Sequence, residues 1–290
     1  MAISWKSRLK EHFEKNDSWP KIIMIYLFLL LCCFITIYPI SFIFTVSLRP
    51  GNQLFSTSLK LIPDNATFKN YSDAFTKYPM AKWMLNSMFV SSLTAVIAVI
   101  ISVNAGYAFS RYRFWGRRFG LTLLLVTQMF PAPMLLLPVY LMLVRLKLTN
   151  SYVGLILWYV STAVPFNIWL MKGYFDTIPR SLEESAFIDG ASIFRAYWSI
   201  ILPLAKPAVA LCALFAFMGA WSEFIVARIL ITSKSMLTLP VGLIALQGSF
   251  STEWGIYSAA ALVTAIPVTV LFIALSRYLV GGLTLGSVKG

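Results

Sequence analysis

Charged residues are scarce in this sequence. Asp, Glu, Lys and Arg together make up 12% of its 290 residues, roughly half the share found in an average soluble domain. Hydrophobic residues make up 59%, and the mean hydropathy is +0.77. A soluble fold of this length has too little interior to bury so much apolar surface. The composition therefore predicts a membrane protein.

Histidine and cysteine are nearly absent as well. There is one histidine, His12, and there are three cysteines, all inside apolar stretches. One histidine cannot anchor a metal cluster, and the cysteine positions form no disulfide framework, so we expect no metal site. The sequence also has no glycine-rich phosphate loop and no Ser/His/Asp set. We therefore expect no catalytic residues in this chain.

Long stretches without any charged residue are present instead. Five of these stretches exceed the ~20 residues that a helix needs to cross the bilayer core. A shorter one, 207–222, reaches that length if it continues through Glu223 to Ala227. Since lipid leaves no partner for free backbone groups, and no period-2 alternation is present, the sequence predicts an all-α membrane protein with six transmembrane helices. The stretches are 22–48, 83–110, 119–144, 148–171, 207–222 and 254–276.

The positions of Lys and Arg predict the topology. They gather in alternate loops, most clearly in the short stretch Arg111–Arg118, which places both termini in the cytoplasm under the positive-inside rule. The same rule accounts for the net charge of +13 without a nucleic-acid partner. We expect short helices against the membrane in the outer loop and Trp83 as an interfacial anchor. The predicted segments are a cytoplasmic N-terminal segment 1–21, helix one 22–48, an extracytoplasmic loop 49–82, a core 83–280 with helices two to six and the cytoplasmic connection 173–206, and a cytoplasmic tail 281–290.

The connection 173–206 contains a patterned segment from Ser181 to Pro203. Ser181 and Glu184 form a capping-box pattern, which predicts the start of a short helix. Asp189-Gly190 is a turn signal that ends it. Ser192 is a candidate N-cap for a second helix, which we expect to run to Leu202 and stop at Pro203. The product is a helix–turn–helix elbow.

This segment resembles the EAA motif of ABC importer permeases. The family pattern is Glu-Ala-Ala, three residues, Gly, nine residues, Ile, one residue and Leu-Pro. Ser185 replaces the first alanine, and every spacing is kept. Other stretches, including Ala105–Arg111 and Gln128–Pro131, look like sugar-importer permeases, so the chain resembles the MalFG-type carbohydrate family with its type I importer fold. The six matching motif positions are Glu184, Ala186, Gly190, Ile200, Leu202 and Pro203.

The resemblance implies that the elbow couples to a separate ATPase subunit. The glycine-rich tail also resembles the family's tail, which reaches into the ATPase dimer. Two alternatives stay open: Glu184 serves only its own capping box, or the tail is only a frayed terminus. The implied coupling residues are Glu184, Ser185, Ala186, Phe187, Ile188, Asp189, Gly190, Ile200, Leu202 and Pro203, and the implied tail contacts are Ser287, Val288, Lys289 and Gly290.

The resemblance also implies the partners. They are a second permease completing a heterodimer, an ATPase dimer that binds ATP and Mg, an extracytoplasmic sugar-binding protein, membrane lipid and an oligosaccharide. No cofactor is expected in this chain, which would be a multi-pass protein of the cell (inner) membrane. Maltose or maltodextrin is the predicted cargo, with trehalose, raffinose or alginate oligomers as alternatives. An ion-coupled secondary transporter is a further alternative, although inverted repeats are not evident.

Polar residues inside the apolar stretches are candidates for the transport pathway. Asn104, Gln128, Asn167 and Glu223 are predicted on this basis, since polar groups at membrane depth are costly and usually functional. Glu223 has an alternative role in a gating or interface salt bridge near Arg228. In the maltose importer the partner permease holds the substrate, so it stays open whether this chain touches sugar.

Overall fold

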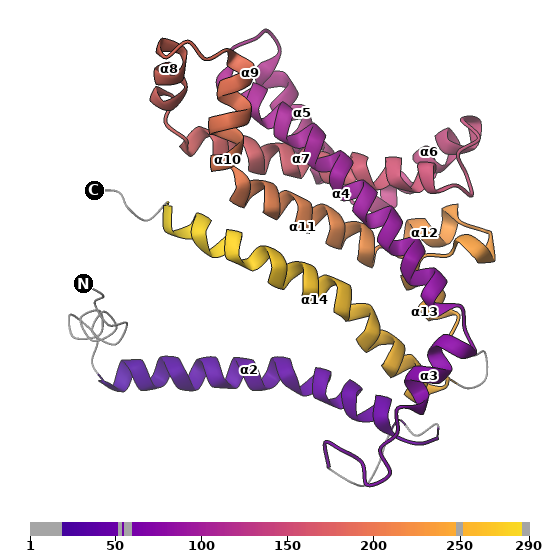
Figure 1. Ribbon diagram of the computed structural model, residues 1–290. Coiled ribbons are helices and arrows are strands. Elements are labelled where there is room, and N and C mark those ends of the chain that lie inside the picture. The colour runs from indigo at the N-terminus through magenta and orange to yellow at the C-terminus, as the bar shows by residue number, and fades with distance from the viewer. Residues whose placement is uncertain (1–18, 52–53, 55–59, 248–251, 286–290) are drawn as a thin grey trace.

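The computed structural model describes residues 19–51, 54, 60–247 and 252–285, and these residues are almost entirely helical (Figure 1). The helices are α2 (Trp19–Leu48), α3 (Lys69–Thr76), α4 (Met80–Arg111), α5 (Arg117–Met129), α6 (Ala132–Arg145), α7 (Tyr152–Thr177), α8 (Ser181–Ile188), α9 (Ile193–Ala196), a π-helical turn η1 (Tyr197–Ile201), α10 (Leu202–Leu204), α11 (Lys206–Ser222), α12 (Ile225–Leu230), a 3-10 turn η2 (Lys234–Met236), α13 (Leu239–Ile244) and α14 (Trp254–Leu285).

Four single helices are long and apolar enough to cross a membrane: α2, α4, α7 and α14. Two bent helix pairs pass the same test together, each as a broken span or a re-entrant loop. Helices α5 and α6 meet at 106°, and the segment 193–204 meets α11 at 72°. Pro131 is the N-cap of α6, where its fixed φ suits a new helix start. The described residues therefore hold four to six candidate spans.

The predicted continuation of the fifth span to Ala227 is wrong. Helix α11 ends at Ser222, and Glu223 has an extended backbone with ψ of 127°. The Glu223 carboxylate accepts hydrogen bonds from the backbone N–H groups of Val226 and Ala227, at 2.8 and 3.0 Å. It therefore satisfies the free donors at the start of α12 instead of extending α11.

Helix α4 lies at the centre of the bundle, packed along α7 and α11. Helix α14 packs on the other side of α11, and α2 contacts α14 and the short helix α3 (Figure 1). Trp83 of α4, predicted as an interfacial anchor, is 4% exposed and packs against Gly242 of α13, so its indole faces the protein interior. A Cβ on Gly242 would lie 2.2 Å from the indole, and this close contact explains the burial.

The ends of the helices sort into two sides. The N-terminal end of α2, the C-terminal end of α14 and the α8–α9 segment lie together, whereas α3, α12 and α13 lie at the opposite end (Figure 1). The predicted topology requires this grouping. Helix α14 reaches Leu285, so the predicted tail 281–290 begins inside a helix. The predicted tail contacts 287–290 lie outside the described residues.

A charged cluster joins α3 to the start of α14. Lys77, after α3, lies 3.1 Å from Asp73 and 3.6 Å from Glu253, just before α14. The hydrogen bond to Asp73 raises the pKa of Lys77 above its ordinary value. Burial, followed by the hydrogen bond to Glu253, raises the pKa of Tyr78. The cluster ties the start of α14 to α3.

Candidate coupling segment and transport cavity

The elbow predicted between the fourth and fifth spans is present. Helix α8 ends at Ile188, and Gly190 takes a left-handed backbone with φ of +81°. The N–H of Gly190 donates to the carbonyl of Phe187 at 3.0 Å, and the N–H of Ala191 donates to that of Ala186 at 2.8 Å. These two bonds form a Schellman motif, which closes a helix end and favours glycine in the left-handed position.

The first helix begins differently from the prediction. Ser181 is the first helical residue of α8, and Arg180 occupies the N-cap position in a right-handed helical conformation without a side-chain bond. The first turn is instead closed by the N–H groups of Glu183 and Glu184, which donate to the Arg180 carbonyl. The predicted capping box is therefore wrong, because the helix starts one residue earlier than the pattern requires. Glu184 is left exposed and outside any capping role.

The second helix follows the prediction at its start only. Ser192 caps α9, with its hydroxyl accepting from the N–H of Arg195 at 3.2 Å. The helix does not stop at Pro203, however, since it passes through η1 and ends at Leu204. Pro203 is the second residue of α10, directly after η1, so it lies within this continuous stretch and does not end it.

The elbow presents an apolar surface to its surroundings. Ile188 is 87% exposed and Phe194 is 71% exposed, far more than apolar side chains usually are in a finished assembly. We call this the elbow surface. Its exposed apolar residues are Leu182, Phe187, Ile188, Ile193, Phe194 and Trp198.

The predicted coupling residues divide between this surface and the bundle. Glu184, Ser185, Phe187, Ile188, Asp189, Gly190 and Pro203 are exposed. Ala186 is buried at 6%, and Ile200 and Leu202 are half-buried against the cluster that includes Met171 and Phe175 of α7. The second half of the motif therefore attaches the elbow to the bundle.

A buried carboxylate that the sequence reasoning missed holds the other side of α8. Glu183 lies 2.6 Å from the Nε of Arg111, at the end of α4, and both side chains are 7% exposed. The hydroxyl of Tyr107 donates to the other Glu183 oxygen at 2.7 Å. Two consecutive glutamates thus have opposite environments, with Glu183 buried and Glu184 exposed.

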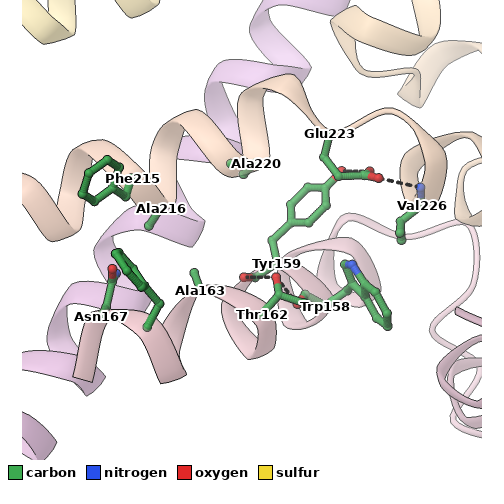
Figure 2. A pocket seen from close by; sticks show the side chains of 12 residues that line it. Trp158, Tyr159, Thr162, Ala163, Asn167, Phe215, Ala216, Ala220, Glu223 and Val226 are labelled. Carbon is green, nitrogen blue, oxygen red and sulfur yellow. Dashed lines mark hydrogen bonds between the residues drawn. The ribbon is translucent and has the colours of Figure 1, made fainter. Parts of the chain in front are cut away.

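A cavity of about 270 Å³ lies between α7 and α11 (Figure 2). Its lining residues on α11 belong to the last turns of that helix, at the end away from the elbow (Figure 1). The cavity combines aromatic faces with a few polar groups, the usual composition of a small-molecule site. Its lining consists of Trp158, Tyr159, Thr162, Ala163, Phe166, Asn167, Phe215, Ala216, Gly219, Ala220, Glu223 and Val226.

Glu223 closes one end of this cavity. Its carboxylate accepts a hydrogen bond from the Tyr159 hydroxyl at 2.9 Å in addition to the backbone bonds at the start of α12 (Figure 2). Among the described residues it forms no ion pair with Arg228, so the alternative of a salt bridge there is not supported. Glu223 therefore fixes Tyr159 and α12 around the cavity.

Asn167 lies at the other end of the cavity and is fully buried. Its Nδ2 donates to the Cys212 carbonyl of α11 at 3.2 Å, while its Oδ1 has no hydrogen-bond partner. A buried acceptor without a partner costs about 1–3 kcal/mol, so such an atom is normally satisfied by water or a ligand. Phe166 and Phe215, in edge-to-face contact at 5.6 Å, lie beside it.

The structure brings together only two of the four pathway candidates. Asn104 is exposed on α4, where its Oδ1 accepts from the Tyr197 hydroxyl at 3.3 Å. Gln128 is exposed on α5, with its Nε2 3.5 Å from the Thr162 carbonyl. Asn167 and Glu223 alone line the cavity.

Substitution of Gly190 tests the backbone of the elbow. No atom lies within 4 Å of a Cβ built there, so the requirement for glycine comes from φ and not from packing. We expect Gly190→Val to destabilise the elbow by roughly 1–2 kcal/mol and Gly190→Asn by less, since asparagine tolerates the left-handed region. Proteolysis at the elbow and sugar uptake measure the effect. Gly51, with φ of +76° and open surroundings, is the matched control, and equal behaviour of the valine and asparagine variants at Gly190 would contradict the argument.

Comparison with known proteins identifies the family. Residues 96–284, more than half of the chain, match the family described as the binding-protein-dependent transport system inner membrane component. The galactooligosaccharides transport system permease protein GanQ of Bacillus subtilis is 39% identical over 95% of this chain and 98% of its own. The maltodextrin transport system permease protein MalD of Streptococcus pneumoniae is 38% identical over 91% and 94%. The maltose/maltodextrin permease MalG of Vibrio vulnificus is 35% identical over 88% and 91%.

Solved structures share the fold. A crystal structure of a bacterial ABC transporter involved in import of the acidic polysaccharide alginate matches with a TM-score of 0.77 at 24% identity, over 96% of this chain and 99% of that one. A second structure, a bacterial alginate ABC transporter in complex with an alginate pentasaccharide-bound periplasmic protein, matches with a TM-score of 0.62 at 14% identity, over 94% and 96%.

The relatives are transport permease proteins, and the match to this chain covers nearly their whole length. The described helices include several that are able to span a membrane. The sequence resemblance to the MalFG-type permeases is therefore confirmed, as is a multi-pass location in the cell membrane. The chain belongs to the binding-protein-dependent transport system inner membrane component family and is a permease subunit of a carbohydrate ABC importer.

Proposed function

We propose that this permease carries maltodextrins or a closely related oligosaccharide, and that a separate ATPase subunit drives it through the elbow surface. The observation that carries the proposal is the cavity between α7 and α11. Sugars bind by stacking their apolar faces on aromatic rings while their hydroxyls take hydrogen bonds. Phe166 and Phe215 offer aromatic faces to the cavity, and Thr162 and Glu223 offer accessible hydrogen-bonding groups.

The elbow surface supports the coupling role. Exposed side chains such as Ile188 and Phe194 need a partner to cover them, and Glu184 adds a charge for a basic residue of that partner. The ATPase subunits would hold ATP and Mg, and this chain would need no cofactor and perform no catalytic step itself. Residues 287–290 would reach the same ATPase dimer.

The proposed topology has six spans with the elbow and both termini in the cytoplasm. The basic stretch from Arg111 to Arg118 follows α4 at the elbow end of the bundle, as the positive-inside rule requires. The cavity end then faces outward, toward an extracytoplasmic sugar-binding protein. Side chains from Ile23 to Ile40 on α2 are exposed in the isolated chain, and lipid and the second permease of the heterodimer would cover them.

Reconstitution of the complete complex tests the proposal. The permease, its partner permease, the ATPase and the binding protein from the same cell are assembled in liposomes containing ATP. We expect the ATPase to co-purify with the permease and maltotriose to be taken up only with ATP. A galactooligosaccharide of the same length is the second arm, because the GanQ relative is 39% identical. Uptake of neither sugar, with the complex intact, would contradict the choice of cargo.

A further inference from the structure

The attachment of α8 to α4 uses more than the Glu183 carboxylate. The Nη2 of Arg111 also donates to the carbonyl of Ile178 at 2.9 Å, just before α8. In return, the Nη2 of Arg180 donates to the carbonyl of Ser110, in the last turn of α4, at 3.1 Å. The chain leading into α8 is therefore held to the end of α4 by polar contacts in both directions.

The site lies where four elements meet. The Tyr107 ring of α4 packs on Phe175 of α7 with centroids 5.6 Å apart, and on Tyr197 of η1 at 4.7 Å. Its hydroxyl reaches Glu183 of α8. A displacement of α8 therefore acts on α4 directly, and α4 packs along both helices that line the cavity.

Stability alone does not explain a charged contact here. Removing two charges from water is costly, and apolar residues of similar volume usually hold helices together at least as well as a buried ion pair. What a charge-assisted pair adds is a fixed direction, because the carboxylate oxygens must meet defined donors. Here the directed contacts come from the Tyr107 hydroxyl, the Nη2 of Arg111 and the Nη2 of Arg180, which together fix how α8 is oriented on α4. The ion pair between Arg111 and Glu183 adds attraction at the same place.

We propose that Glu183, Arg111 and Tyr107 form a rigid joint that makes α8 and α4 move as one unit when the ATPase acts on the elbow surface. They are positioning residues and contact neither sugar nor nucleotide. The inference rests on the proposed function, since it assigns the transmission step between the elbow and the cavity. Glu184, exposed one position later, stays available to the ATPase.

The test uses Glu183→Gln in the complete reconstituted complex. Glutamine keeps the shape and an acceptor for the Tyr107 hydroxyl but removes the charge facing Arg111. We expect the amount of ATPase that co-purifies to stay within about twofold of the unsubstituted complex, because the elbow surface is unchanged. We expect stimulation of ATP hydrolysis by the sugar-loaded binding protein, and uptake per complex, to fall about tenfold, within the usual range of coupling between sites.

A smaller substitution tests the joint even if Glu183→Gln impairs folding. Tyr107→Phe removes only the hydroxyl that reaches Glu183 and keeps the ring contacts. We expect stimulation of ATP hydrolysis by the loaded binding protein to fall by about threefold, within the range for the loss of one ordinary hydrogen bond. Asp64→Asn is the matched control, because it breaks an exposed pair with Lys60 far from the joint, and we expect no change.

The outcomes separate the joint from the proposed function. If uptake by the Glu183→Gln complex falls only in proportion to the amount of complex assembled, the pair is a structural contact and the joint is refuted. The joint is also refuted if the loaded binding protein stimulates ATP hydrolysis by the Glu183→Gln complex as much as by the unsubstituted complex. If the unsubstituted complex itself binds no ATPase or takes up no sugar, the proposed function fails first, whatever the variants do.

Discussion

Replacing Gly219 by phenylalanine is expected to abolish sugar uptake while the permease stays folded. Gly219 lines the cavity on α11, and a Cβ built there meets nothing within 4 Å. A phenyl ring can therefore occupy the cavity without moving the backbone. Phenylalanine also has a better helix propensity than glycine, by roughly 0.3–0.5 kcal/mol, so the helix itself is not weakened.

The expected loss of uptake for Gly219→Phe exceeds about tenfold, since blocking the pathway adds more than about 1.4 kcal/mol to the transport barrier. Uptake of labelled maltotriose into liposomes measures it, with ATPase co-purification as the folding check. Gly173→Phe is the control, because Gly173 also lies in a helix with open space around it but does not line the cavity. Full uptake by the Gly219→Phe complex would exclude this cavity as the sugar pathway.

The sequence predicted the features that depend on short-range or one-dimensional information. Apolar stretches predicted the candidate spans because crossing a bilayer requires a minimum length of uncharged helix. The turn at Gly190 and the cap at Ser192 were predictable for a similar reason, as each depends on the backbone within a few residues. The resemblance to carbohydrate permeases depended on fixed spacings, which survive without knowledge of packing.

Features that depend on tertiary contacts were not predictable. Two glutamates stand side by side at 183 and 184, and successive residues point about 100° apart around a helix. Only the docking of α8 on Arg111 decides which of them is buried. The burial of Trp83 was not predictable for the same reason, since its partner Gly242 is remote in the sequence. A charged or aromatic residue at the end of a predicted span therefore has no unique environment until its neighbours are known.

The sequence also could not show which of its polar residues line the cavity. Asn167 and Glu223 were predicted as polar residues within spans, and so were Asn104 and Gln128. All four have the same signal in the sequence, but only the pairing of α7 with α11 brings two of them to one cavity. The glycine and alanine residues that make room for it, such as Gly219 and Ala220, carry no functional signal by themselves.

Replacing Gly106 by valine is expected to disrupt the bundle itself. Gly106 lies where α4 crosses α7, and a Cβ there would be 2.6 Å from the Cβ of Met171 and 3.0 Å from the backbone N of Lys172. Neither atom can rotate away, because one is fixed to the backbone and the other is part of it. The two helices must move apart, and overpacking of this kind costs about 1–3 kcal/mol or more.

Thermal unfolding in detergent and the yield of folded permease measure the loss for Gly106→Val. Gly120→Val is the matched control, because a Cβ at Gly120 meets only the ring edge of Phe109 at 3.4 Å, an ordinary contact. Equal thermal stability of the two variants would contradict close packing of α4 on α7.

Tyr107, the residue after Gly106, donates a hydrogen bond to Glu183, so separating α4 from α7 also displaces the joint. We therefore expect the folded fraction of the milder Gly106→Ala variant to retain ATPase binding but to lose stimulation by the loaded binding protein. That result would tie helix packing in the bundle to the orientation of the elbow.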